Sequence, residues 1–424
     1  MSLRKVKEAQ SVTAQDVQQL QDAVSSILRK VRDEGDTAIR YYAKKFDNFE
    51  KEFRVTREEA SKAKDKLPPE VIEELDFAIK QVTAFAQEQR ACLKDSEKEY
   101  FPGFSMGHRV LPVASCGCYV PAGRYPCLTS AVMSVIPAQV AGVKRIVVCS
   151  PPSRDGGINP GILYTLYKMG VEEIYCLGGP NAIAALAYGT ETIKPVDMIA
   201  GPGNKYVQEA KRQVFGHCGI DFLAGPSEVL VLADDSARPD WVAADLLAQA
   251  EHDPNARASL VTNSETLAFA VIDEIEKQLK VLETEEVARA SWEVKGEAVV
   301  CDTIAECIEY ANEYAPEHLE VHCREPREIM MQLENYGSLF LGELTAEVYA
   351  DKISGTNHIL PTGRCARYTG GLWVGMYLKV ITHQSTDINA SLKLARYAEN
   401  QAIYEKMDAH RQAAAIRILH LNKK

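Results

Sequence analysis

The fold is decided by a stretch that reads Glu173-Ile-Tyr-Cys-Leu177, then Gly178-Gly179-Pro180, then Asn181 to Tyr188. The short apolar run predicts a buried strand, the glycines predict a turn, and the Ala-rich run predicts a helix. The same order recurs on both sides of this stretch. Further strands are expected over residues 145–149, 196–200, 228–233, 259–262 and 298–302. Strands that alternate with helices of about 10–15 residues are typical of βαβ units and parallel sheets.

The strand–helix pattern occurs in two separate runs, and 424 residues suffice for two or three domains of about 150 residues each. We therefore expect an α/β fold with two doubly wound, incomplete Rossmann-like domains. The first hundred residues and the chain from Asp387 onward are expected to be helical, as periodic apolar positions indicate. The expected parts are an N-terminal arm (1–17), a first α/β domain (18–118 plus 229–372), a second α/β domain (119–228) and a C-terminal helical tail (373–424).

Composition excludes several classes of protein. The chain is 46% hydrophobic and 25% charged, which is the balance of a globular protein rather than a disordered one. Its net charge of −11 disfavours binding to a nucleic-acid backbone. No run approaches the about 18 apolar residues of a membrane helix, and the start Met1-Ser2-Leu3-Arg4-Lys5 lacks the apolar region of a signal peptide. Eleven scattered cysteines without a CxxC pair favour buried thiols in a reducing compartment, so a cytoplasmic protein is expected.

Glycine-rich turns follow the expected strands at 178–181, 201–204 and 224–227. In open α/β sheets, ligands bind beyond the carboxyl ends of the strands, where glycine lets the backbone approach a phosphate. Tight turns alone would also explain each of these glycines. Tyr206 stands where the usual dinucleotide fingerprint has its third glycine, so a dinucleotide would have to bind here in an unusual way.

Several residues could bind a metal ion. No cysteine set has zinc-ligand spacing, so a metal site would have to use His, Asp, Glu or amide ligands. Gln249 and His252 lie three residues apart, which places them on one face of a helix. Asp351 precedes His358 by seven residues, and His410 lies in the tail. A single histidine is more often a surface or core residue than a ligand, so spacing alone does not join these residues into one site.

The dipeptide Glu317-His318 follows Pro316 and forms a second group of candidate catalytic residues. An adjacent carboxyl and imidazole could activate a water molecule and shuttle a proton. Pro-Glu is also an ordinary start of a helix, so the pair by itself does not establish an active site.

Taken together, these motifs resemble the histidinol dehydrogenase family over nearly the whole chain, from about Val17 to Ile416. The resemblance implies a zinc- and NAD-dependent enzyme that oxidises a primary alcohol to a carboxylate in two hydride transfers. Five motifs in the family's order carry it: Gly201-Pro-Gly-Asn204, Ala224-Gly-Pro-Ser-Glu-Val-Leu-Val231, Gln249-Ala-Glu-His252, Pro316-Glu-His-Leu319 and Ser354-Gly-Thr-Asn-His-Ile-Leu-Pro-Thr362.

The resemblance also implies a role for individual residues. His318 would remove the alcohol proton, and Glu317 would deprotonate the water that attacks the bound aldehyde. Asn181 departs from the glutamine that histidinol enzymes usually carry there. The family's tail packs across a dimer interface, so a homodimer is implied in which His410 completes the partner subunit's site. The implied ligands of one zinc ion per subunit are Gln249, His252, Asp351 and His410. The implied substrate contacts are these ligands together with His318, Ser227 and Glu405, and His358 lies in the motif that lines the site. The implied NAD contacts are Tyr119, Asn181 and Asn204.

Two segments depart from the enzymes that oxidise histidinol, namely Pro121 to Pro126 and Ala366 to Gly375. The stretches Gly117 to Pro121, Arg124 to Pro126 and Arg367 to Gly375 are similar to the sulfopropanediol 3-dehydrogenase branch, which oxidises 2,3-dihydroxypropane-1-sulfonate to sulfolactate. A sulfonate is a permanent anion, so its pocket needs guanidinium or ammonium donors. The candidates are Arg124, Arg364 and Arg367, each of which could equally be a solvated surface residue.

Three alternatives remain open at this point. Histidinol or another vicinal amino or hydroxy alcohol could be the substrate. The chain could also be a non-catalytic zinc- or nucleotide-binding homologue with a structural or regulatory role. The competent residue types at every expected zinc and catalytic position favour an active enzyme.

Overall fold

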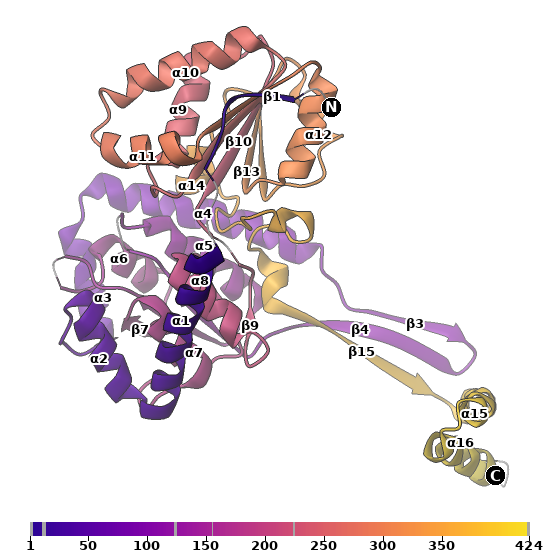
Figure 1. Ribbon diagram of the computed structural model, residues 1–424. Coiled ribbons are helices and arrows are strands. Elements are labelled where there is room, and N and C mark those ends of the chain that lie inside the picture. The colour runs from indigo at the N-terminus through magenta and orange to yellow at the C-terminus, as the bar shows by residue number, and fades with distance from the viewer. Residues whose placement is uncertain (1–2, 11–13, 123–124, 155, 224, 422–424) are drawn as a thin grey trace. The chain divides into compact units, whose positions relative to one another are not determined.

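The computed structural model describes residues 3–10, 14–122, 125–154, 156–223 and 225–421. The chain forms two compact units. Unit 1 contains Met1–Glu88 and Val113–Tyr377, and unit 2 contains Gln89–Pro112 and Leu378–Lys424. Unit 1 holds two six-stranded sheets, both mostly parallel and flanked by helices, which confirms the expected α/β fold (Figure 1).

The first sheet of unit 1, sheet A, has the strand order β1-β12-β11-β10-β13-β14. The strands β10 to β14 run parallel, and β1 joins the edge antiparallel to β12. The expected N-terminal arm therefore contributes a strand to this sheet. The strands are β1 (Leu3–Lys7), β10 (Glu228–Ala233), β11 (Arg257–Thr262), β12 (Glu297–Cys301), β13 (His318–His322) and β14 (Ser338–Leu341).

Helices bury both faces of sheet A. Val229 and Val231 of β10 pack with α9, α10 and α11, whereas Leu230 and Leu232 pack with α12 and α13. Burial on both sides explains why β10 reads as an uninterrupted apolar run after its first residue. The helices are α9 (Pro239–Ala250), α10 (Glu265–Leu279), α11 (Glu285–Lys295), α12 (Ile304–Tyr314), α13 (Pro326–Met330) and α14 (Glu347–Lys352), the last of which contacts α9.

The second sheet of unit 1, sheet B, has the strand order β2-β7-β6-β5-β8-β9. All of its pairings are parallel except that of the short edge strand β2 with β7. Its strands are β2 (Arg54–Val55), β5 (Ser115–Tyr119), β6 (Arg145–Ser150), β7 (Glu173–Cys176), β8 (Met198–Ala200) and β9 (Gly219–Ile220). Its connecting helices are α5 (Leu128–Ala141), α6 (Pro160–Lys168), α7 (Gly179–Tyr188) and α8 (Lys205–Val214).

The expected boundaries join the N-terminal helices to residues 229–372, whereas α1 and α3 pack with helices of sheet B. Helix α1 contacts α7 and α8, and α3 contacts α6. An apolar stripe shows that a helix is buried on one side but does not show which element covers it, so periodicity could not assign these helices. The elements are α1 (Ala14–Glu34), α2 (Asp36–Asp47), α3 (Arg57–Ser61), the 3₁₀ turn η1 (Lys62–Lys66) and α4 (Pro69–Ala91), with η2 (Cys365–Arg367) and η3 (Val374–Tyr377) later in unit 1.

Unit 2 consists of a three-stranded antiparallel sheet, in the order β15-β4-β3, and two helices (Figure 1). The helical tail expected after Asp387 is present, and the Asp387 side chain caps its first helix by accepting the Ala390 N–H. The sheet was not expected. Its strand β3 reads Ser-Glu-Lys-Glu-Tyr-Phe and is mostly exposed, so it lacks the apolar alternation that marks a half-buried strand. The elements are β3 (Ser96–Phe101), β4 (Phe104–Pro112), β15 (Leu378–Thr386), α15 (Ile388–Tyr404) and α16 (Asp408–Leu421).

Two further expectations concern the whole chain. Each of the eleven cysteines is a thiol rather than half of a disulfide, and eight of them are buried. Among the described helices, none combines the length and apolar character needed to cross a bilayer.

Candidate active site

The expected catalytic pair lies at the amino end of β13, where Glu317 precedes the strand and His318 begins it. Both side chains are buried. His318 stands opposite Val229 of β10, which brings the start of β10 beside Glu317. The Glu228 backbone N–H donates a hydrogen bond of 2.7 Å to Glu317 Oε2. Burial nevertheless raises the pKa of Glu317 well above its ordinary value, with help from the Glu228 and Asp351 carboxylates, so its ionised form is a strong base.

His318 is held in one tautomer. Its Nδ1 lies 3.0 Å from the backbone carbonyl oxygen of Glu228. A carbonyl oxygen only accepts, so Nδ1 carries the proton and Nε2 keeps its lone pair. Burial lowers the pKa of His318 to about 4, and the imidazole is neutral near pH 7. Nε2 is therefore available to take a proton from a substrate.

The expected metal ligands of unit 1 converge from two helices. Gln249 lies in the last turn of α9 and His252 lies just beyond it, while Asp351 lies on α14. His252 Nε2 is 3.5 Å from Asp351 Oδ2. Although burial opposes ionisation of Asp351, the charges of His358, His252 and Lys352 outweigh it and lower the pKa of this carboxyl. Asp351 is thus an anion suited to a cation.

His358 supports the metal-ligand segment rather than supplying a ligand. Its Nδ1 donates to the backbone carbonyl of Asp351 at 3.0 Å, and its Nε2 accepts from the Ser130 hydroxyl at 2.8 Å. The Thr129 hydroxyl donates to the same Asp351 carbonyl at 2.7 Å. Since Ser130 and Thr129 belong to α5, these bonds tie the Asp351 segment to a helix of sheet B.

Glu347 is a residue of this site that the sequence did not suggest. Its Oε1 lies 3.4 Å from His318 Nε2. Burial, followed by repulsion from Asp351, raises the pKa of Glu347 well above its ordinary value. His318, Glu347 and Asp351 place ligand atoms within 4.8 Å of one another. The available signal was the i, i+4 spacing of Glu347 and Asp351, which places both carboxyls on one helix face.

The remaining expected substrate and metal contacts are spread over both units. Ser227 immediately precedes β10, and its backbone carbonyl accepts from the Arg257 N–H at 2.9 Å. Glu405 and His410 belong to unit 2, where Glu405 caps the end of α15 and His410 is an exposed residue of α16. The structure therefore brings together part of the expected constellation within unit 1, and these two residues are described only within unit 2.

The expected cofactor residues lie at the carboxyl edge of sheet B. Tyr119 ends β5, and its buried hydroxyl accepts the Gly179 N–H at 3.1 Å. Asn181 lies in the first turn of α7, directly after β7. Asn204 follows β8 and caps α8, its side chain accepting the Tyr206 and Val207 amides. The carboxyl ends of parallel strands are where α/β sheets bind nucleotides, as the glycine turns predicted.

A buried ion pair fixes one of these turns. Gly201 has φ +118°, and a Cβ there would collide with the backbone carbonyl of Tyr119. Lys211 and Asp221, both fully buried, form an ion pair. Lys211 Nζ donates to the Gly201 carbonyl at 3.0 Å, and Asp221 Oδ2 accepts the Gly201 N–H at 2.8 Å. Both backbone groups of Gly201 are thus satisfied internally, and the turn is rigidly positioned.

These residues fit a zinc ion and a nucleotide. Gln249 Oε1 and Asn181 Nδ2 are buried and have no hydrogen-bond partner within the part of the chain that the structure describes. A buried polar atom without a partner costs free energy, which a bound group can recover. Amide oxygen, imidazole and carboxylate are all ligand types that zinc accepts. The orphaned Asn181 amide points to a hydrogen-bonding ligand at the edge of sheet B.

The arginine candidates differ in their surroundings. Arg124 lies outside the described residues. Arg364 and Arg367 are both exposed, and Arg367 Nε donates to the Arg364 carbonyl at 3.1 Å. Arg364 also borders a cavity of about 200 Å³, which is lined by Glu228, Arg257, Tyr310, Glu313, Tyr314 and Arg364. Of the two described candidates, Arg364 shares this cavity with a second guanidinium, that of Arg257.

Comparison with known proteins agrees with this geometry. The histidinol dehydrogenase family model matches residues 10–418. The chain is 44% identical to a histidinol dehydrogenase homolog of Shouchella clausii, covering 95% of each chain. It is equally 44% identical to a histidinol dehydrogenase of Geobacillus kaustophilus, covering 93% of each. The crystal structure of a histidinol dehydrogenase from Elizabethkingia anophelis superposes with a TM-score of 0.89 at 35% identity, covering 99% of this chain and 95% of that one.

Proposed function

The chain belongs to the histidinol dehydrogenase family, and we propose that it oxidises 2,3-dihydroxypropane-1-sulfonate to sulfolactate. The family comprises zinc- and NAD-dependent dehydrogenases that remove four electrons from a CH–OH group. The observation that carries the chemistry is the buried, neutral His318 beside a Glu317 of raised pKa. Such a pair offers one base for each of the two oxidation steps.

His318 Nε2 would take the proton of the substrate hydroxyl, and a bound NAD would supply the hydride acceptor. The bond from Nδ1 to the Glu228 carbonyl keeps Nε2 free for this transfer and stabilises the imidazolium that forms. Glu347, 3.4 Å from Nε2, lies where it can receive the proton from His318. Neutrality of His318 near pH 7 means that the base is ready without a prior deprotonation.

Glu317 acts in the second oxidation. The Glu228 N–H orients its Oε2, and its raised pKa makes the ionised carboxylate able to deprotonate a water molecule. That water would add to the aldehyde, and a second NAD would supply the acceptor for the hydride that the hydrate loses. Because Glu317 Oε2 lies 3.6 Å from the imidazole of His318, the aldehyde need not move between the two steps.

The zinc ion would be held by Gln249, His252, Asp351 and the partner's His410, and when bound it would polarise the substrate oxygen and lower the pKa of its proton. Tyr119, Asn181 and Asn204 would contact the NAD. Ser227 and Glu405 would contact the substrate. The assembly proposed is a homodimer in which each tail completes the partner subunit's site.

The substrate assignment rests on two guanidinium groups near the start of β10. Arg257 and Arg364 border the same cavity, and a guanidinium binds a sulfonate through two parallel hydrogen bonds. Glu228 connects this cavity to the catalytic pair, because its amide binds Glu317 and its side chain lies 4.0 Å from Arg257. Burial raises the pKa of Glu228, which reduces the negative charge that an anion would meet there.

L-Histidinol is the second candidate substrate. The chain is as similar to a protein named histidinol dehydrogenase as to one named a homolog of it, so sequence identity does not separate the two substrates.

The test is NADH production by zinc-loaded enzyme that is offered either the sulfonate diol or L-histidinol. We expect about two NADH per diol consumed and no reaction with histidinol. Turnover of histidinol alone would refute the sulfonate assignment and leave the family chemistry intact. Arg364→Met should raise KM for the diol and leave kcat nearly unchanged, while Arg327→Met, which alters an exposed arginine of α13, is the matched control.

The exchanged tail has its own test, which uses two variants that are each impaired in steady-state turnover. Glu317→Gln lacks the water-activating base and His410→Asn lacks the ligand from the tail. In a mixed dimer, the intact Glu317 of one chain would meet the intact His410 of the other. Activity that reappears on mixing supports donation across the interface, and a mixture that forms heterodimers but stays inactive refutes it.

A further inference from the structure

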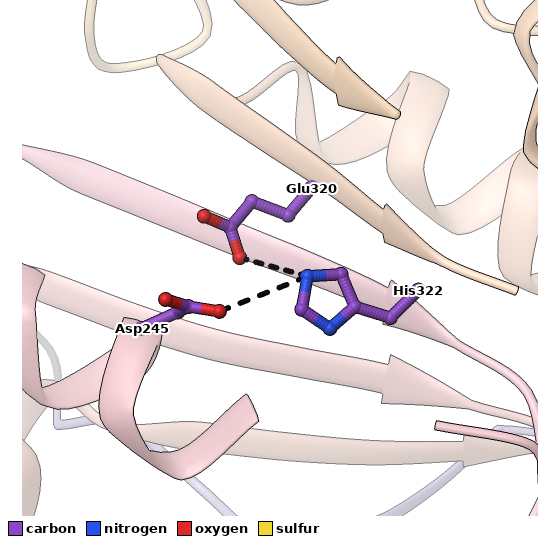
Figure 2. A group of neighbouring side chains, drawn as sticks. All are labelled: Asp245, Glu320 and His322. Carbon is purple, nitrogen blue, oxygen red and sulfur yellow. Dashed lines mark ion pairs between the residues drawn. The ribbon is translucent and has the colours of Figure 1, made fainter. Parts of the chain in front are cut away.

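A second group of metal-ligating side chains lies apart from the expected zinc ligands. Figure 2 shows Glu320 and His322 on β13 and Asp245 on α9, with both carboxylates directed at the same ring nitrogen. His322 Nε2 is 3.3 Å from Glu320 Oε2 and 3.7 Å from Asp245 Oδ2. Glu320 and His322 are almost fully buried, while the Asp245 side chain keeps 15% exposure and offers a way in from solvent.

Regular secondary structure brings the three residues together. Glu320 and His322 are two apart on a strand, so they point to the same face of sheet A as His318. Asp245 is four residues before Gln249, and therefore lies one turn earlier on the same face of α9. The group thus stands one helical turn from the expected zinc ligand Gln249.

Two of the facing atoms lack hydrogen bonds. Glu320 Oε2 and His322 Nε2 are buried without a hydrogen-bond partner among the described residues. The other oxygen of Glu320 accepts the Glu347 N–H at 2.8 Å, and this bond fixes the carboxylate with Oε2 aimed into the group. Native proteins rarely leave buried polar atoms unpaired, so each such atom calls for an explanation.

The separations match shared coordination better than direct pairing. A charge-assisted N–H···O bond is about 2.7–2.9 Å long, which is shorter than both distances here. Nitrogen and oxygen ligands at about 2.0–2.1 Å from a tetrahedral ion lie about 3.3 Å from one another. The observed 3.3 and 3.7 Å therefore leave room for an ion among the three side chains.

We propose that Asp245, Glu320 and His322 bind a divalent transition-metal ion of the zinc or manganese type, at a site distinct from the one formed by Gln249, His252, Asp351 and His410. One imidazole and two carboxylates suit such ions, and three protein ligands leave a position for water. The bound ion cross-links α9 to β13 and so stiffens the helix that carries Gln249 and His252.

The pKa values of two of these side chains depart from their ordinary values in the metal-free chain. Burial and the Glu320 carboxylate raise the pKa of Asp245 to about 8. Burial favours the neutral form of His322, but Glu320, Asp245 and the nearby Glu343 outweigh it and raise the pKa of this imidazole.

The test counts metal ions in protein that has been stripped with a chelator and reloaded with Zn²⁺. We expect about two ions per wild-type chain, and the loss of one in Asp245→Asn and in His322→Gln. His252→Asn should lose the other ion and keep this one. Asp240→Asn is the matched control, because Asp240 is a half-buried residue of the same helix whose side chain pairs with Arg238 at the surface. A metal count that Asp245→Asn and His322→Gln leave unchanged overturns the proposal.

A measurement on the wild-type protein makes the test independent of how the variants fold. Crystals grown with Mn²⁺ or Zn²⁺ should give an anomalous peak among Asp245 Oδ2, Glu320 Oε2 and His322 Nε2. Crystals in which the Gln249 and His252 site is filled and this position shows no peak would overturn the proposal as well.

Discussion

The backbone carbonyl of Glu228 accepts a hydrogen bond from Nδ1 of His318 at 3.0 Å. The acceptor is a main-chain atom of β10, and the same residue's N–H binds Glu317 at 2.7 Å. One peptide segment therefore orients both catalytic side chains, through groups that no side-chain substitution at Glu228 removes. The roles of the two side chains are therefore tested by substituting Glu317 and His318 themselves rather than Glu228.

Glu317→Gln should separate the two oxidation steps. A glutamine oxygen can still accept the Glu228 N–H, but the amide cannot take a proton from water. We expect the second hydride transfer to slow by about 10²–10⁴-fold, with the first much less affected. Single-turnover measurements should then show about one NADH formed rapidly per site where the wild type forms two. Glu309→Gln, on the exposed face of α12, is the control, and equal loss of both steps with zinc retained would show that Glu317 does not activate water.

His358→Ala should weaken zinc binding without removing a ligand. The substitution deletes the bonds to the Asp351 carbonyl and to Ser130, which together position the Asp351 segment. Residues that orient ligands typically contribute about 10–100-fold to metal affinity. Chelator competition would measure the effect, with His217→Ala at an exposed position as the control. A zinc affinity equal to that of the wild type would mean that Thr129 alone suffices to hold the segment.

The metal-free enzyme should lose stability in mild acid because of His318. Its pKa is about 4 in the folded chain and about 6.5 when unfolded, so between these values the unfolded state binds more protons. The contribution is therefore fully present above pH 6.5 and is lost as the pH falls toward 4. Between pH 8 and pH 5 it amounts to about 2 kcal/mol.

Urea unfolding of the chelator-treated protein at these two pH values would measure that loss. The variant His318→Gln should lose less stability on acidification than the wild type, since its side chain does not titrate. Other buried groups titrate in both proteins, so the difference between them isolates His318. An identical loss in both proteins would show that His318 is not held neutral.

Gly201→Ala should impair NAD binding. Gly201 has a positive φ, and its Cβ would occupy the position of the Tyr119 carbonyl, so the turn must shift. We expect the Kd for NAD to rise by about tenfold or more, measured by titration calorimetry. Gly157→Ala is the matched control, because a Cβ at Gly157 would have no neighbouring atom within 4 Å and its φ is not positive. Unchanged affinity would place the NAD away from this turn.

The regular parts of the fold could be predicted from the sequence because they leave a local signal. The strand 173–177 and the helix after Gly178 follow from apolar runs and turn residues that lie next to one another. The sheet of unit 2 could not be predicted in this way. Its strands carry exposed charged residues, and the pairing of β15 with β4 joins segments more than two hundred residues apart. Such pairing depends on tertiary contacts that no short window contains.

The candidate site shows the same limit. Gln249 and His252 are visible as a pair because helical spacing relates them. Glu347 and Asp245 can be recognised as site residues only from their contacts with β13. That strand lies at least 25 residues away in sequence from either of them. Motif resemblance supplied the expected zinc and catalytic residues, whereas the buried carboxyls around them became apparent only when the strand and the helices were placed together.

Strand β13 carries His318, Glu320 and His322 on one face and Leu319 and Val321 on the other. Because side chains alternate along a strand, inserting or deleting one residue here would turn the whole polar set into the apolar core and bring the apolar set into the site. Change in this strand is consequently restricted to substitution at fixed length. The catalytic imidazole and the side chains that face Asp245 depend on the same register of β13, so a shift that displaces one displaces the other.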